Sequence, residues 1–62
     1  MKIDDILNVI IELSYSQGFY GRLYRSLMDC KENDPSSYAD YVEQLEAQNF
    51  GDALDVVLFF ET

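Results

Sequence analysis

Residues 16–28 read SQGFYGRLYRSLM and contain both the first turn of the chain and the start of the helix that follows it. Apolar and aromatic side chains recur from residue 19 to residue 28 at intervals of three and four, the pattern of an amphipathic helix. Ser16 suits a helix N-cap, and Gly18 suits the residue after a helix end. We therefore expect the chain to turn at residues 15–18 and to continue as a helix over 17–31.

Two glycines fall within one turn of this helix, at positions 18 and 21. Each glycine costs a helix about 1 kcal/mol relative to alanine, so we expect another backbone to approach them closely. The pair does not form a dinucleotide-binding loop, because that loop needs a third glycine and a preceding strand.

The residues before the turn predict another helix, over residues 3–15. Asp4 and Asp5 would lie in its first turn, where the helix dipole favours negative charge. Its apolar residues share one helical face, namely Ile3, Ile6, Leu7, Ile10 and Leu13.

The clearest break in the chain is Asp34-Pro35, because aspartate is a good N-cap and proline is well tolerated at the first helical position. It predicts a third helix over 35–49, followed by Gly51 as a left-handed residue. Residues 52–61 are apolar on nearly all sides, and their valines and phenylalanines would also suit a strand. Since the chain offers no second strand to pair with, we favour a short helix there.

These patterns predict an all-α fold, a small bundle of three main helices plus a short apolar C-terminal helix, in a single domain over residues 1–62. A chain of 62 residues buries only about 60% of the surface that its unfolded form exposes. Its single cysteine, Cys30, allows no internal disulfide. Stability must therefore come from helix packing, either within one chain alone or together with a second copy or another protein.

The residues that most enzymes use are missing or poorly placed. Histidine, the commonest general base and metal ligand, does not occur. Cys30 lies next to Asp29 and close to Glu32, and nearby carboxylates disfavour the reactive thiolate. The sequence therefore predicts a protein that is not an enzyme and that uses no cofactor or metal.

The charged residues are unevenly distributed. Residues 1–31 hold four cations and four anions, whereas residues 32–62 hold eight anions and no cation, so the whole net charge of −8 lies in the second half. Such a chain is poorly suited to bind nucleic acid directly, or to bind an anionic membrane. No segment has the features of a signal peptide or a membrane span, and a lone thiol suits a reducing compartment. Together these observations predict a cytoplasmic protein.

Three sets of residues are candidates for contacting a protein partner. The first is an acidic face, which would either mimic phosphates in the basic groove of a nucleic-acid-binding protein or form an ordinary solvated surface. It comprises Asp40, Glu43, Glu46, Asp52 and Asp55. The second is a basic-aromatic island, which would either be a binding hot spot or clamp the bundle internally. It comprises Tyr20, Arg22, Tyr24 and Arg25.

The third set is apolar and lies in the last helix. It would either fill the centre of the core or form a docking or homodimer face. It comprises Val56, Val57, Phe59 and Phe60.

Three runs of the chain, 16–23 (SQGFYGRL), 45–50 (LEAQNF) and 52–60 (DALDVVLFF), carry a family resemblance. They resemble a group of small, uncharacterised proteins of prophages, plasmids and conjugative elements in Gram-positive bacteria, and the resemblance extends over nearly the whole chain. It implies a mobile-element protein that acts inside a bacterial cell. Small acidic proteins from that setting are often inhibitors of host defence nucleases, including anti-CRISPR proteins, which is an analogy of size, charge and setting.

The functional expectation is a non-enzymatic protein-binding module of a mobile element, acting through its acidic second half as an inhibitor of a host nucleic-acid-binding protein. The alternative is a small structural or assembly protein that dimerises or docks through its apolar C-terminal helix. In that alternative the carboxylates serve only solubility.

Overall fold

The computed structural model describes residues 1–61, and within them the chain forms four helices and no strand. The helices are α1 (Ile3–Ser14), α2 (Gly18–Asn33), α3 (Pro35–Ala47) and α4 (Ala53–Glu61). The prediction of an all-α bundle is confirmed, and each predicted helix end lies within two residues of the observed one. The last apolar run is a helix rather than a strand.

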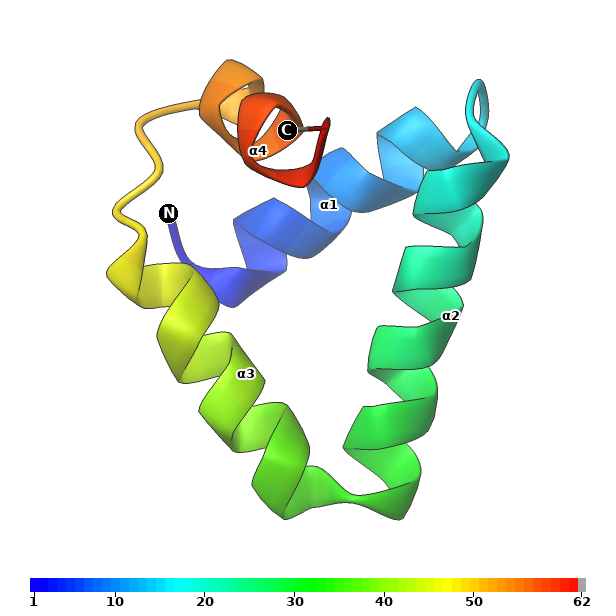
Figure 1. Cartoon of the computed structure of the whole chain (residues 1–62), viewed down its shortest axis with the longest axis vertical. Helices are drawn as coiled ribbons and strands as arrows, with labels where there is room; N and C mark the ends of the chain where they lie inside the picture. Colours follow the sequence, from blue (N-terminus) through cyan, green and yellow to red (C-terminus); the bar gives the residue numbers. More distant parts are fainter. Residues whose placement is uncertain (62) are drawn as a thin grey trace.

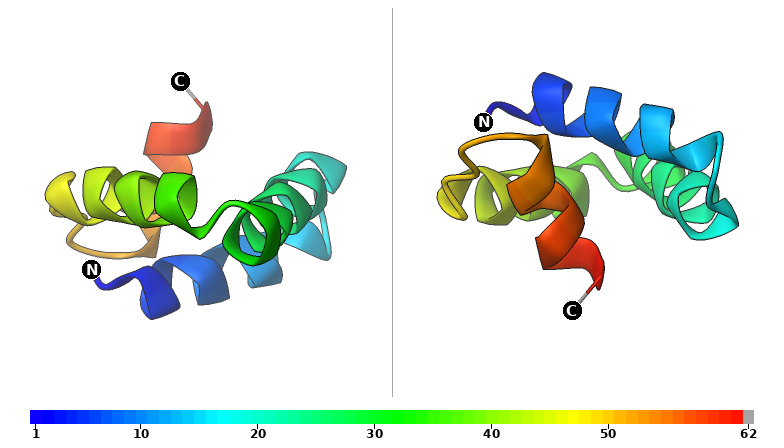
Figure 2. Two further views of the ribbon diagram at one scale, coloured as in Figure 1. Left: turned by 90° about the horizontal axis from the view of Figure 1, so that it is seen from below. Right: turned by 90° about the horizontal axis from the view of Figure 1, so that it is seen from above.

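The helix α1 is the centre of the arrangement. With α2 and α3 it forms three sides of a triangle, and it is the one helix that packs against all the others (Figure 1). Within the described residues the backbone of α4 comes close to α1 but to neither α2 nor α3. Seen from above and below, α1 lies on one side of the α2–α3 pair and α4 projects from the other side (Figure 2). The molecule measures 28 × 25 × 19 Å.

Two hydrogen bonds connect the start of the chain to the end of α3. The backbone amide of Ile3 donates to the Glu46 carboxylate at 2.9 Å, which satisfies a free N–H in the first turn of α1. The ammonium group of Met1 donates to the carbonyl oxygen of Phe50 at 3.0 Å. These contacts join segments more than 40 residues apart in sequence and close the triangle at the corner between α1 and α3.

A side-chain cap marks the start of α3 but not the start of α2. Asp34 accepts a hydrogen bond from the amide of Ser37 at 3.3 Å, and Pro35 occupies the first turn of α3, both as predicted. At the first turn of the chain, the hydroxyl of Ser16 donates to the carbonyl of Leu13 at 3.2 Å. Ser16 therefore belongs to the end of α1, and α2 begins without a side-chain cap after Gln17.

The expected left-handed residue after α3 is found at a different position. Asn49 has a φ of 57°, whereas no glycine has a positive φ, so the prediction for Gly51 is wrong. The reason is that α3 ends at Ala47 with Gln48 as its C-cap, which makes Asn49 the next residue. Asparagine is the usual second choice to glycine in this conformation.

The two glycines of the first turn are not required by close packing. A Cβ at Gly21 would lie 3.9 Å from the Cβ of Ser14, and a Cβ at Gly18 would lie 3.7 Å from a guanidinium nitrogen of Arg22. Both distances are ordinary van der Waals contacts. The expected close approach of another backbone is therefore not what selects glycine here.

The core draws on every helix and on the α3–α4 linker. Its buried side chains are Ile6, Ile10, Tyr20, Leu27, Leu45, Phe50 and Val56. Since α2 and α1 contribute two residues each and the other segments one each, the removal of any one element would open this core.

Tyr20 is the largest side chain in the core and is fully buried. Its ring packs edge to face on Phe19, with the ring centroids 5.2 Å apart. The Glu61 carboxylate lies near its buried hydroxyl, but neither it nor any other described residue meets the geometry of a hydrogen bond to that hydroxyl. Burial raises the pKa of Tyr20, and the negative charge of Glu61 at the end of α4 raises it further.

The buried hydroxyl of Tyr20 leads to a prediction for Tyr20→Phe. At pH 7 we expect the free energy of unfolding to stay unchanged or to rise by up to about 1 kcal/mol, because a buried polar group without a partner is removed. Because the folded state holds the phenolic proton more tightly than the unfolded chain, the wild type should lose stability as pH rises above about 10. The Tyr20→Phe variant should lose less stability than the wild type over the same pH range. Urea unfolding followed by circular dichroism at pH 7, 9 and 10.5 measures both effects.

The matched control is Tyr15→Phe, which removes the hydroxyl of a side chain that is 86% exposed. That change should leave stability within about 0.5 kcal/mol of the wild type at pH 7. A loss of more than about 1.5 kcal/mol in Tyr20→Phe at pH 7 would show instead that the hydroxyl makes a stabilising hydrogen bond.

Candidate protein-docking site

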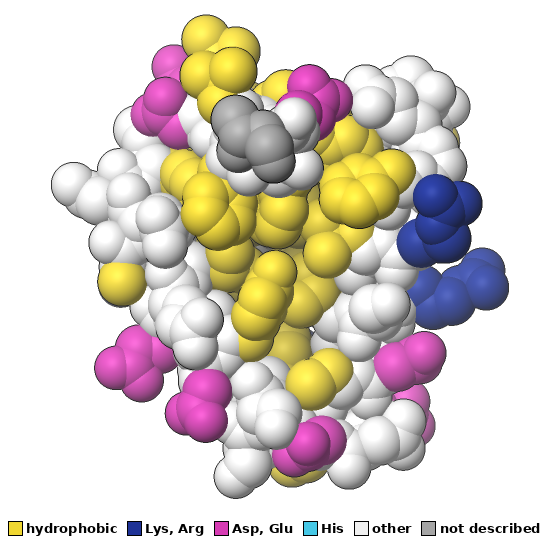
Figure 3. Space-filling view, in the orientation of Figure 1, with side chains coloured by type: hydrophobic (Ala, Val, Ile, Leu, Met, Phe, Trp, Pro, Cys, Tyr) yellow, Lys and Arg dark blue, Asp and Glu magenta, His cyan; other side chains and the backbone are white. Residues whose placement is uncertain are grey.

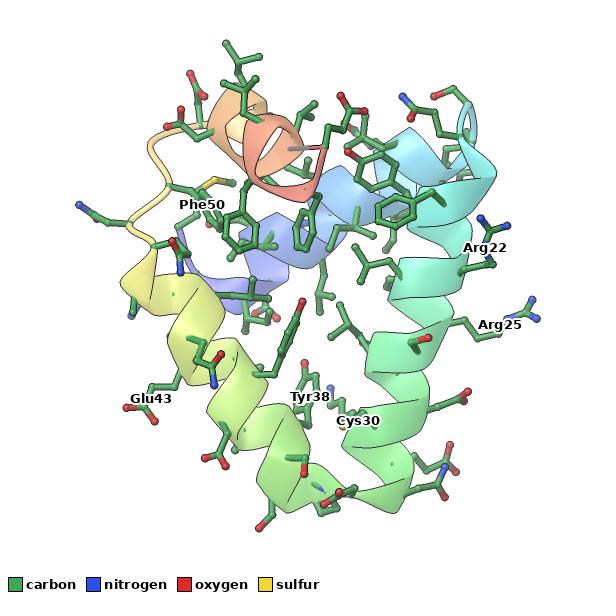
Figure 4. All side chains as sticks on the ribbon, viewed as in Figure 1. Arg22, Arg25, Cys30, Tyr38, Glu43 and Phe50 are labelled. Carbon is green, nitrogen blue, oxygen red and sulfur yellow. The ribbon has the colours of Figure 1, made fainter. Side chains whose placement is uncertain are left out.

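The acidic face predicted from the sequence is divided in the structure. Asp40 and Glu43 are exposed on α3, where they line an open depression with Gln44 and Ala47. Glu43 points away from the other helices (Figure 4). Among residues 1–61 neither carboxylate has an ion pair or a hydrogen bond. These two side chains are available to a partner.

The other three carboxylates of that set stabilise helix ends. Glu46 is half-buried and accepts the hydrogen bond from the amide of Ile3. At the start of α4, Asp52 accepts from the amide of Asp55 at 3.2 Å, and Asp55 accepts from the amide of Gly51 at 2.8 Å. Asp52 therefore caps the first turn of α4, and the Asp55 carboxylate reaches one residue further back than in a capping box, to Gly51 instead of the N-cap residue.

The structure places the two arginines of the basic-aromatic island outside the bundle. Arg22 and Arg25 are exposed on α2 and point away from the other helices (Figure 4). No carboxylate of the described chain lies within 4.0 Å of either guanidinium. Tyr20, in contrast, is in the core, and Tyr24 is half-buried against it. The four residues therefore do not form one surface, and the arginines are not internal clamps.

The apolar set of α4 is also divided. Val56 is fully buried and belongs to the core, so its assignment to a docking face is wrong. It lies on the side of α4 that packs towards α1. Phe59 and Phe60 follow it by three and four residues and therefore share this side of the helix. Phe59 nevertheless remains 41% exposed, and Phe60 and Val57 are half-buried.

Two exposed residues of α4 were missed as candidates. Leu54 and Leu58 are 62% and 52% exposed. They are four residues apart and each is two residues from Val56, which places them on the opposite side of the helix. This spacing was visible in the sequence, but it became informative only once Val56 was known to face the core.

Hydrophobic side chains gather on one face of the molecule, over α4 and in the space between α2 and α3 (Figure 3). Tyr38 of α3 and Cys30 of α2 point into this space from opposite sides (Figure 4). Tyr41, one turn after Tyr38, is half-buried against the core. We call this surface the apolar cradle, with walls formed by α2, α3 and α4. We define it by Cys30 and Tyr38, by Tyr41, and by Phe59 and Phe60, whose rings pack in series onto that of Phe50.

Aromatic contacts give the apolar cradle a firm wall on α4. The ring centroid of Phe59 lies 5.4 Å from that of Phe50 and 5.1 Å from that of Phe60, each edge to face. On the α3 wall, burial raises the pKa of Tyr41, which indicates apolar surroundings. The Lys31 ammonium of α2 lies 5.8 Å from the centre of the Tyr38 ring and links the two walls by a cation–π contact.

Within residues 1–61 no group of three or more carboxylate or cysteine side chains is arranged to hold a metal ion. The Cys30 thiol donates to the carbonyl oxygen of Asp34 at 3.6 Å. No helix in this part of the chain has the length and apolar character needed to cross a bilayer.

Comparisons of the chain with protein-family models, with curated proteins and with solved structures found no match.

The division of the carboxylates predicts different effects on stability. Glu46→Ala should lower the free energy of unfolding by about 1–2 kcal/mol, because it removes a charged acceptor from the N-terminus of α1. Asp40→Asn and Glu43→Gln, on the exposed side of α3, should each change it by less than about 0.5 kcal/mol. Urea unfolding of the three variants at pH 7 measures the difference. Equal effects would contradict the structural role of Glu46.

Proposed function

We propose that this chain is a non-enzymatic protein-binding module that docks its partner on the apolar cradle. One observation carries the proposal: a face rich in hydrophobic side chains that no other helix of the described chain covers (Figure 3). Large contiguous apolar surfaces are rare on monomeric proteins, and they mark sites of interaction.

The residue types in the apolar cradle support this proposal. Phenylalanine and tyrosine are enriched where protein interfaces are most tightly packed, and tyrosine adds a polar tip that can find a hydrogen-bond partner. The exposed Phe59 stands on a helix that is fixed at its start by the Asp52–Asp55 caps and further along by the buried Val56. While α4 is folded, an aromatic side chain held in this way loses little entropy when a partner covers it.

The proposal also includes a setting inside a bacterial cell, as a protein of a prophage, plasmid or conjugative element. This part rests on the resemblance of residues 16–23, 45–50 and 52–60 alone.

The two sides of α4 supply a direct test of the docking site. Phe59→Ser should weaken partner binding at least tenfold, whereas Leu58→Ser, an equally polar change on the opposite side of the helix, should leave it unchanged. The measurement is capture from a Gram-positive bacterial lysate on the immobilised wild type and both variants, with helix content checked by circular dichroism. Binding that is lost in Leu58→Ser but kept in Phe59→Ser would place the site on the outer side of α4.

A second candidate function is inhibition of a nucleic-acid-binding protein, of the anti-CRISPR or nucleic-acid-mimic type, through the acidic second half. The exposed Asp40 and Glu43 favour it, since neither has a counter-ion within the described chain and no cation follows Lys31 in the sequence. It is the weaker candidate because Glu46, Asp52 and Asp55 already stabilise helix ends, which leaves fewer carboxylates to imitate a line of phosphates.

The double variant Asp40→Asn, Glu43→Gln separates the two functions. A nucleic-acid mimic should lose at least tenfold in affinity for a nucleic-acid-binding protein captured from the lysate, and that protein should elute from the wild type at moderate salt. The control variant Arg22→Gln, Arg25→Gln should keep the wild-type affinity for that protein. Capture that survives the acidic double variant but not Phe59→Ser would exclude the mimic.

A further inference from the structure

The apolar cradle lies between two helices whose outer sides carry opposite charge. Arg22 and Arg25 point outward from α2, and Glu43 points outward from α3 on the other side of the molecule (Figure 4). Asp40 lines the same depression as Glu43. All four side chains are exposed, and none has an ion pair within the described chain. The cradle is thus flanked by unpaired cations on one side and unpaired anions on the other.

We infer that a second copy of this chain covers the apolar cradle, related to the first by a two-fold axis that lies in this face and runs between α2 and α3. Such an axis turns the α2 side of each copy towards the α3 side of the other. Arg22 and Arg25 of one copy then face Asp40 and Glu43 of its partner, and the symmetry repeats this pairing a second time. The inference rests on the proposed docking function and names the partner for that site.

The size of the face agrees with a dimer of modest affinity. Seen along its shortest axis, the whole molecule measures 28 × 25 Å, and the apolar cradle is the central part of this outline (Figure 3). An interface over this part is smaller than the roughly 800 Å² per partner of a standard interface, which suits weak association. Association would also remove the exposed part of Phe59 from water.

The net charge sets the expected strength of the dimer. Each chain carries a net charge of −8, so two copies repel each other as a whole even where their edges attract. We therefore expect a dissociation constant of roughly 1–100 µM at physiological salt. The attraction between the charged edges of the two copies is best measured by exchanging the charges.

Charge exchange tests the pairing of the edges. The basic variant is Asp40→Lys, Glu43→Lys, and the acidic variant is Arg22→Glu, Arg25→Glu. Each alone brings like charges together at both edges and should remain monomeric, whereas an equimolar mixture restores opposite charges at both edges. Sedimentation equilibrium from 5 to 500 µM should show the wild type and the mixture approaching twice the monomer mass.

Three results would overturn the inference. The first is a wild type that stays monomeric at 500 µM. The second is a dimer that both charge variants form as readily as the wild type does. The third is a dimer that Phe59→Ser leaves intact while Leu58→Ser weakens it. Circular dichroism of each variant confirms that a lost dimer does not reflect a lost fold.

The inference and the proposed function can fail separately. A monomeric wild type whose captured protein is still lost in Phe59→Ser would leave the docking function standing with a different partner. If Phe59→Ser changes neither mass nor capture, the apolar cradle is not a docking site at all.

Discussion

The hydrogen bond between the amide of Ile3 and the carboxylate of Glu46 is the constraint on which the arrangement depends. It fixes the start of α1 against the end of α3, and the bond from Met1 to the carbonyl of Phe50 extends the contact into the linker. With this corner closed, α1 is left in contact with every other helix. The position of α4, and with it the wall of the apolar cradle, follows from how the linker leaves this corner.

Much of the fold could be predicted from the sequence because helix periodicity and capping are local properties. Asp34-Pro35 marked the start of α3, and the apolar spacing before residue 15 marked α1. The candidate site was less predictable, since the roles of its residues depend on which helix ends meet. No pattern near Glu46 indicates that its carboxylate reaches Ile3, and none near Val56 shows which side of α4 faces the core.

The charges contribute little to holding the monomer together. Within the described chain the arginines of α2 have no ion pair, and the carboxylates that do stabilise the fold act on backbone amides at helix ends. Exposed ion pairs add little stability in any case. The remaining charges are therefore free to determine what the surface attracts, and the core alone sets most of the stability.

The attachment of α4 has a consequence for the motions of the native protein. Its backbone approaches only α1 within the described residues, so α4 is the helix that should open with the smallest free energy and exchange its amide hydrogens first. Opening would withdraw Val56 from the core, but it would also let water reach the hydroxyl of Tyr20 beside Glu61. Hydration of the Tyr20 hydroxyl offsets part of the free energy lost with the apolar contacts of Val56. The helix α4, which forms one wall of the apolar cradle, is therefore also the helix that unfolds locally most easily.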